Sequence, residues 1–233
     1  MSLFYDETGR EAMIERRHKS LMRPVVRQGS DKALRIERVD ILPEAASSYI
    51  DYVVSDEGKQ NFSTLPQVAI IDIGGRTTDV AVMIGGTSID RSRSGTEEIG
   101  VLDLLESIAA AVPAEVARQM GKTVPCTIPA RLVEAQLISF QKKGTAEIVL
   151  FGRRFDLTGI VERALKAFVR QIHARAQRRI EGISAQMEAI LVTGGGAALT
   201  QSTLGEMYPH LIVPQDPQYS NVRGMLKYML YLS

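Results

Sequence analysis

The stretch VAIIDIGGRTTDVAVMIGG, residues 68–86, restricts the fold of this chain more than any other part of the sequence. An apolar run ends in Asp72, and a second apolar run starts at Asp79. These runs predict two buried strands joined by a short polar turn. The turn holds two glycines and two threonines, namely Gly74, Gly75, Thr77 and Thr78. Strands this apolar need other elements to cover them, so the unit predicts a sheet inside a larger domain.

The composition of this turn suits a phosphate cradle. Glycines let backbone N–H groups point at a bound anion, and Thr77 and Thr78 add hydroxyl donors. Phosphate would repel the Asp72 carboxylate, but this carboxylate can hold Mg²⁺ directly or through water, and the ion then neutralises the phosphates. An ordinary hairpin uses the same residue types, so the residues alone leave both interpretations open.

A second glycine turn lies in LVTGGGAAL, residues 191–199. Its three glycines follow a predicted strand and precede a predicted helix that starts at Ala197. The same backbone argument makes it a second candidate cradle. By itself, however, a tight strand-to-helix connection is the simpler explanation of this turn.

One further carboxylate stands at a predicted helix start. Glu44 directly follows Pro43, a residue that suits the first position of a helix. A glutamate in the first turn complements the helix dipole, and the residues alone favour that simple role over a chemical one.

Patterns elsewhere predict an α/β plan. Helical periodicity or helix-forming composition predicts helices over residues 7–23, 43–54, 97–112, 129–140 and 158–180. Two more are predicted, one that starts at residue 197 and one over residues 220–231. Pro113 is expected to end the third of these helices. Extended segments are predicted over residues 34–41, 68–73, 79–84, 87–93 and 189–193, with a hairpin through Gly152.

Composition narrows the possible partners and locations. The formal net charge of the 233 residues is +1, which gives no general argument for contact with nucleic acid or an anionic membrane. No apolar run is long enough to span a membrane, and the single cysteine, Cys126, excludes an internal disulfide. The three histidines show no ligand spacing. We therefore expect a cytoplasmic globular protein without direct nucleic-acid or membrane contacts.

Five segments, in this order, resemble the actin-like ATPases, and within them the plasmid-segregation family of ParM or StbA type. They are ILPEAASSY (41–49), IIDIGGRTTDVAVM (70–83), SGTEEIGVLDLLESI (94–108), LVTGGGAAL (191–199) and PQYSNVRGM (217–225). The resemblance implies the ribonuclease-H-like superfold shared by actin, hexokinase and heat-shock ATPases. It further implies a mixed five-stranded sheet flanked by helices.

The resemblance also assigns roles within a site for Mg²⁺ and ATP, with GTP as an alternative nucleotide. Asp72 would lie near Mg²⁺, and Glu44 would position the water that attacks the γ-phosphate in line. The residues around the β- and γ-phosphates would be Gly74, Gly75, Thr77 and Thr78. Those on the adenosine side would be Gly194, Gly195 and Gly196.

The match leaves part of the family's fold uncovered. The family has two similar domains around a nucleotide cleft, and its first phosphate loop has no counterpart in this sequence. By resemblance, residues 1–50 are the end of an incomplete first domain, 51–215 form the second domain, and 216–233 form a helix that returns to the first. We therefore expect a C-terminal portion of a nucleoside triphosphatase that is inactive on its own.

The leading functional hypothesis is a filament-forming ATPase that segregates plasmid DNA. Its partners would be other copies of the protein and a DNA-binding adaptor. A sugar or acyl kinase of the same superfold is an alternative, although no catalytic aspartate outside the phosphate motif is evident. A non-catalytic actin-like scaffold is a third possibility.

Overall fold

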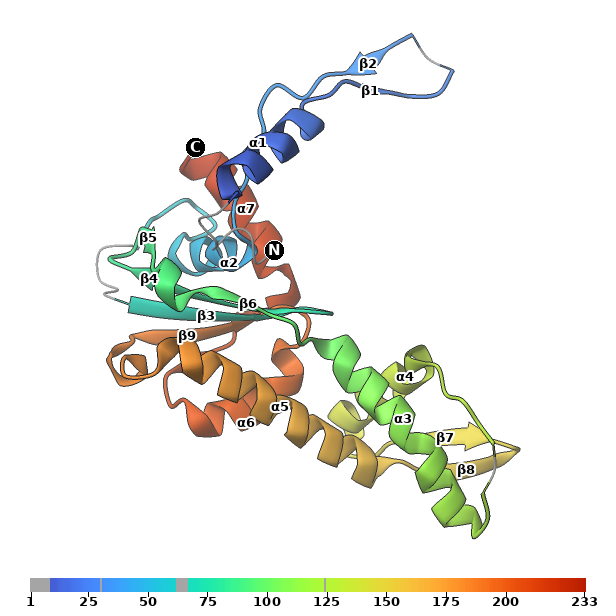
Figure 1. Cartoon of the computed structure of the whole chain (residues 1–233). Helices are drawn as coiled ribbons and strands as arrows, with labels where there is room; N and C mark the ends of the chain where they lie inside the picture. Colours follow the sequence, from blue (N-terminus) through green and yellow to red (C-terminus); the bar gives the residue numbers. More distant parts are fainter. Residues whose placement is uncertain (1–8, 30, 62–66, 124) are drawn as a thin grey trace.

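The computed structural model describes residues 9–29, 31–61, 67–123 and 125–233, and its centre is a mixed sheet (Figure 1). The sheet has six strands in the described residues. They are β3 (Gln67–Ile73), β4 (Thr78–Ile84), β5 (Ser88–Ile89), β6 (Gly95–Glu97), β9 (Ala189–Thr193) and β10 (Leu211–Ile212). Of the helix predicted from residue 7, residues 7 and 8 lie outside the described residues.

The six strands fill five positions, in the order β10, β9, β3, β4 and a divided edge. Strands β10 and β9 run parallel to β3, and β4 runs antiparallel to it. Both β5 and β6 pair antiparallel with β4, at different points along its length. The expected mixed five-stranded arrangement is confirmed.

The strand predicted over residues 87–93, at the edge of the sheet, is wrong, because these residues do not form a continuous strand. Strand β5 ends at Ile89, and a short 3₁₀ helix, η2 (Arg91–Arg93), follows. The Asp90 carboxylate accepts hydrogen bonds from the backbone amides of Ser92 and Arg93. This local cap competes with the strand ladder and interrupts it.

Alternation of side chains explains why the central strands are apolar throughout. Val68 and Ile70 of β3 contact one buried cluster, whereas Ala69, Ile71 and Ile73 contact the other. Successive residues of a strand point to opposite faces, so both faces of this sheet are covered.

Helices form the covering layers on the two faces (Figure 1). On one side lie α2 (Glu44–Val53) and α7 (Ser220–Tyr231), which pack against each other. The other side is covered by α5 (Thr158–Ile180), α6 (Ala197–Met207) and the start of α3 (Val101–Met120). Short 3₁₀ helices, η3 (Ser184–Gln186) and η4 (Pro217–Tyr219), precede β9 and α7.

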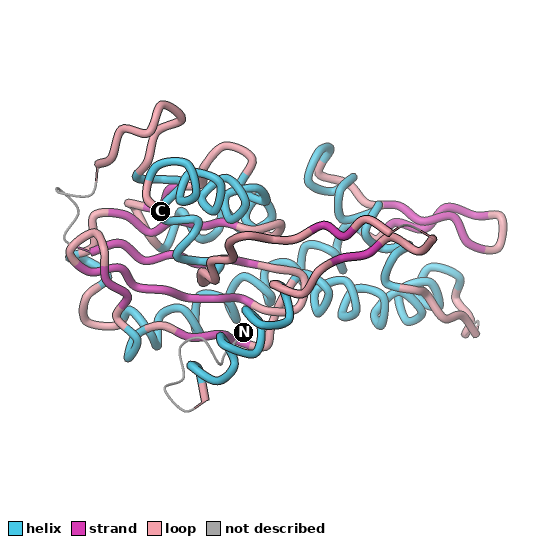
Figure 2. Tube along the Cα trace, turned by 90° about the horizontal axis from the view of Figure 1, so that it is seen from above, coloured by secondary structure: helices cyan, strands magenta, loops and turns pink. Residues whose placement is uncertain are grey.

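A lobe extends from the sheet along α3 and α5 (Figures 1 and 2). It contains α4 (Ala130–Lys143) and the hairpin of β7 (Glu147–Leu150) and β8 (Arg153–Asp156). The predicted end of a helix at Pro113 is wrong, since α3 continues through it to Met120. Val112 and Val116 are fully buried, and this packing offsets the roughly 3 kcal/mol cost of an internal proline.

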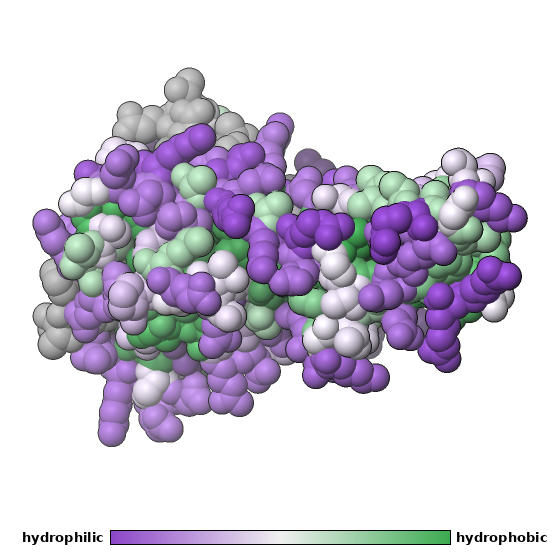
Figure 3. All heavy atoms as spheres, turned by 90° about the horizontal axis from the view of Figure 1, so that it is seen from below, coloured by the Kyte–Doolittle hydropathy of each residue, from purple (hydrophilic) through white to green (hydrophobic). Residues whose placement is uncertain are grey.

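At the start of the described chain, α1 (Arg10–Leu21) and the hairpin of β1 (Val25–Val26) and β2 (Ala33–Leu34) stand away from the sheet (Figure 1). The extended segment predicted at 34–41 forms a strand only at its first residue. Figure 3 shows the molecule from below relative to Figure 1. Polar side chains cover most of the surface seen in this view, with apolar groups visible between them. No helix in the described part of the chain has the length and hydropathy needed to cross a membrane.

Candidate functional site

Strand register gathers polar residues at one end of the sheet. Asp72 of β3 lies opposite Asp79 of β4 and beside Thr193 of β9. By alternation, all three belong to the face that α2 and α7 cover. Because β3 and β9 are parallel, both glycine turns lie at this same end, where ligands commonly bind in open α/β sheets.

The first glycine turn is held in place by α3. The Gly74 amide donates to the Thr77 carbonyl, which closes the turn. The carbonyls of Gly74 and Gly75 accept hydrogen bonds from the first amides of α3, those of Val101 and Leu102. The start of α3 therefore supports the turn and uses its own amides in doing so.

Thr77 and Thr78 differ in their surroundings. Thr78 is buried on β4, and its hydroxyl donates to the Ile99 carbonyl at 2.8 Å. Thr77 remains in the turn and is partly exposed. In this conformation, Thr77 is the better placed hydroxyl donor for a ligand, and Thr78 fixes the strand to the segment before α3.

Close packing explains why two of the three positions in the second turn hold glycine. A Cβ on Gly194 would lie 2.4 Å from Asp72 Oδ1, and its φ is +83°. A Cβ on Gly196 would lie 2.3 Å from Ile73 Cγ2. Both positions require glycine because the turn approaches the end of β3 so closely.

Close packing does not explain why Gly75, in the first turn, and Gly195, in the second turn, are glycines. A Cβ on either would meet nothing within 4 Å, and neither has a positive φ. Among the described residues, neither backbone amide has a protein acceptor. Open space next to an unpaired amide is what a bound anion requires.

The Asp72 side chain is 6% exposed and is held by a residue that the sequence patterns did not single out. Asn221 of α7 donates through Nδ2 to Asp72 Oδ2 at 2.8 Å. Burial raises the pKa of Asp72, the Asn221 hydrogen bond opposes this rise, and the Asp79 charge adds to it. Asn221 lies in the quoted segment PQYSNVRGM, but nothing in the sequence pairs it with Asp72.

Glu44 begins α2, directly after Pro43. Burial raises the pKa of Glu44, and the charges of Asp72 and Asp79 raise it further. The two aspartates are therefore close enough to Glu44 to act on it electrostatically, and the raised pKa makes its carboxylate a better proton acceptor.

The acidic residues fit a magnesium-bound nucleotide better than a metal cage. Burial also raises the pKa of Asp79, and no lysine or arginine among the described residues lowers the pKa of Asp72 or Asp79. A cation beside the two aspartates would favour their charged forms. The described residues contain no group of three or more possible ligands that could hold a metal by themselves. Mg²⁺ commonly takes one or two protein carboxylates and completes its shell with phosphates and water.

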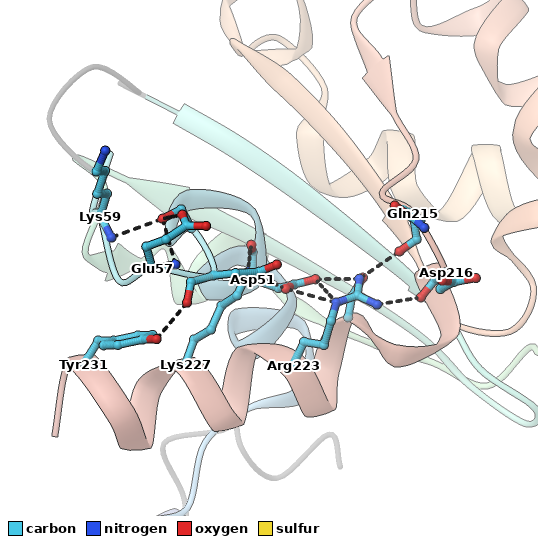
Figure 4. Close-up of polar contacts among 11 residues, drawn as sticks. Asp51, Glu57, Lys59, Gln215, Asp216, Arg223, Lys227 and Tyr231 are labelled. Atoms are coloured by element: carbon cyan, nitrogen blue, oxygen red, sulfur yellow. Dashed lines mark hydrogen bonds and ion pairs between the residues drawn. The ribbon is translucent and has the colours of Figure 1, made fainter.

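Polar contacts between α2 and α7 hold the site together from one side (Figure 4). Asp51, whose side chain is 5% exposed, pairs with Arg223 at 2.7 Å and with Lys227 at 3.0 Å. Arg223 also donates to the carbonyls of Gln215 and Asp216. This loop leads into Pro217, whose carbonyl accepts from the Gly194 amide, so α7 is linked to the second glycine turn.

A cavity of about 520 Å³ adjoins the site. It lies between α1, the segment 38–42 and α7, and Glu44 is the only candidate site residue in its lining. Leu21, Ile41 and Met229 give it an apolar wall. Because neither glycine turn lines it, we treat the cavity as a neighbouring feature and not as the phosphate site.

Comparisons with known proteins bear on the family and the fold of the chain. The family model of the archaeal actin homologue MreB-like, C-terminal, matches residues 70–206, a range that includes both glycine turns. No curated protein matches the chain by sequence.

Solved structures show the actin-like fold. The structure of Ta0583, an archaeal actin homologue, has a TM-score of 0.72 at 16% identity, over 94% of this chain and 65% of that one. Its complex with ADP has a TM-score of 0.67 at 17% identity, over 92% and 66%. A non-polymerisable quadruple mutant of pCBH ParM has a TM-score of 0.69 at 18% identity, over 98% and 66%. The chain thus spans about two thirds of the length of these proteins, and the expected fold class is confirmed.

Proposed function

Because the chain belongs to the family of archaeal MreB-like actin homologues, whose C-terminal domain it carries over residues 70–206, we propose that it forms one wall of a nucleotide site. The ligand is a nucleoside triphosphate with Mg²⁺, either ATP or GTP. The ADP complex of Ta0583, which has the same fold, supports this proposal.

The proposed roles follow the geometry of the turns. Gly75 and Thr77 contact the phosphates. Gly74, whose amide and carbonyl are bonded within the protein, and Thr78 support their turn. Gly194, Gly195 and Gly196 lie on the adenosine side. The carboxylate of Asp72 holds Mg²⁺ directly or through water, and the ion neutralises phosphate charge when it is bound. Glu44, with its raised pKa, orients the attacking water.

The observation that carries the proposal is the pair of open glycines. Gly75 and Gly195 come from segments far apart in the sequence, yet both lie at the same end of the sheet. Each has open space where a Cβ would be and an amide without a protein acceptor. A ligand lying across both turns accounts for glycine at positions that packing and backbone conformation leave unexplained.

A titration followed by amide NMR tests this proposal on the chain itself. Mg-ATP is added up to about 10 mM, which saturates a site even if its Kd is about 1 mM. We expect the amide signals of Gly75 and Gly195 to shift together along one binding curve. Unchanged signals at both glycines with Mg-ATP and with Mg-GTP would show that this wall does not bind nucleotide.

Substitution of the open glycines separates binding from folding. Gly75→Ala and Gly195→Ala are each expected to weaken Mg-ATP binding about tenfold or more, because the new Cβ occupies ligand space. Neither should lower Tm by more than about 2 °C, because the Cβ meets no protein atom. Gly205→Ala on α6, also in open space, is the matched control and should leave binding unchanged. Equal affinities for all three variants would contradict the proposed site.

Hydrolysis and polymerisation are proposed for a longer protein that includes the rest of a first domain. In this proposal, residues 1–50 belong to that first domain, 51–215 form the second, and α7 returns to the first. The chain spans only 65% of the length of Ta0583. The outer face of α7 exposes apolar side chains that a missing neighbour could cover, namely Val222, Leu226, Met229 and Leu230.

A role in plasmid segregation is the finer part of the proposal. Its support is the fold shared with ParM proteins, at 18% identity for pCBH ParM. The partners in this proposal are other copies of the protein and a DNA-binding adaptor, and the location is the cytoplasm.

A further inference from the structure

A line of polar contacts runs from α2 through α7 to the end of β3. The hydroxyl of Ser48, on α2, donates to Asn221 Oδ1. Asn221 Nδ2 donates in turn to Asp72 Oδ2 at 2.8 Å. Ser48 is fully buried and Asp72 nearly so, which makes each of these contacts costly to lose.

Chemistry fixes the orientation of the Asn221 amide. An ionised carboxylate only accepts hydrogen bonds, so the amide nitrogen must face Asp72. The amide oxygen then faces Ser48, whose hydroxyl can donate to it. The reverse orientation would place two oxygen acceptors against each other, so Asn221 holds Asp72 in one arrangement.

This arrangement divides the two oxygens of Asp72 between different neighbours. Oδ2 is occupied by Asn221, whereas Oδ1 lies next to Gly194, at the position where a Cβ would come within 2.4 Å. Oδ1 therefore faces the second glycine turn. The absence of a side chain at Gly194 gives this oxygen its room.

We propose that Asn221 is a positioning residue, which holds Asp72 through Oδ2 and leaves Oδ1 for the cation of a bound nucleotide. The inference rests on the proposed function and adds a residue of α7 to it. The Asp51 ion pairs fix α7 to α2. The orientation of Asp72 therefore also depends on how α7 packs against α2.

The first test needs no nucleotide. Unfolding equilibria of the intact chain are measured for Asn221→Ala, Asp72→Ala, the double variant and the original sequence. A hydrogen bond to a charged group predicts a coupling of about tenfold in the unfolding equilibrium constant. Coupling below about twofold would show that the two side chains do not depend on each other, which overturns the inference.

The second test asks whether Asn221 acts through the cation. ATP binding to Asn221→Ala is measured with Mg²⁺ and with EDTA, next to the original chain and Ser48→Ala. We expect Asn221→Ala to weaken Mg-ATP binding about tenfold and to leave metal-free ATP binding unchanged. Ser48→Ala, which leaves Asn221 in place, should have a smaller effect in Mg²⁺.

The outcomes are distinguishable from each other. Equal weakening with and without Mg²⁺ would mean that Asn221 only supports the fold, and the positioning role would be rejected. If the original chain binds no Mg-ATP, the proposed function fails, and the coupling experiment still decides whether Asn221 positions Asp72.

Discussion

Replacing Gly224 by alanine is expected to remove about 3 kcal/mol or more of the free energy of unfolding, because the new methyl group has no space. A Cβ at this position would lie 1.7 Å from the Ser47 carbonyl oxygen of α2. That oxygen belongs to the backbone, so no side-chain rotation can relieve the overlap, and α7 must move away from α2. Thermal unfolding should show a fall in Tm of about 6–12 °C.

Gly205→Ala is the matched control for this prediction. Gly205 lies inside α6, and a Cβ there would meet nothing within 4 Å. The substitution should stabilise the protein by about 0.5–1 kcal/mol, since alanine favours a helix over glycine. If Gly224→Ala were as stable as this control, the close packing of α2 and α7 would be refuted.

Asp72→Asn is expected to change ligand binding and stability in opposite directions. A neutral amide is a much weaker magnesium ligand than a carboxylate, so Mg-ATP binding should weaken about 100-fold, as expected for loss of a charged metal ligand. Without ligand, the variant should be at least as stable as the original chain at neutral pH, because it no longer buries a charge beside Asp79. Calorimetric titration and thermal unfolding measure the two effects separately.

The pH dependence of stability checks the cause of this difference. The folded pKa of Asp72 is raised above its unfolded value, so at neutral pH its ionisation favours the unfolded chain. As the pH falls through the raised folded pKa toward the ordinary carboxyl range, the original chain should gain stability relative to Asp72→Asn. A stability difference that is constant over this range would show that burial of the Asp72 charge is not its cause.

The sheet and both glycine turns could be predicted from sequence because their signals are local. Runs of apolar residues and the positions of glycines predicted β3, β4 and β9 to within two residues. The end of a helix at Pro113 was a wrong prediction of the same local kind. Burial of Val112 and Val116 by distant segments offsets the cost of the proline there, and no local pattern contains that information.

Within the candidate site, the residue types could be predicted and their contacts could not. Asp72 was evident at the end of a strand, but its partner Asn221 is 149 residues away. Thr78 looked equivalent to Thr77 until the structure showed its hydroxyl on the Ile99 carbonyl. Similarly, the sequence could not separate Gly195 from its neighbours, because only tertiary packing explains Gly194 and Gly196.

The hydrogen bonds from the start of α3 to Gly74 and Gly75 make the first turn a pivot. Helix α3 has 20 residues and therefore spans about 30 Å, from the turn to the far part of the lobe. A tilt of about 5° at the pivot would displace the distal end of such a rod by roughly 2.6 Å. A tilt of α3 at this turn would thus move the far part of the lobe more than the turn itself, in proportion to the length of the helix.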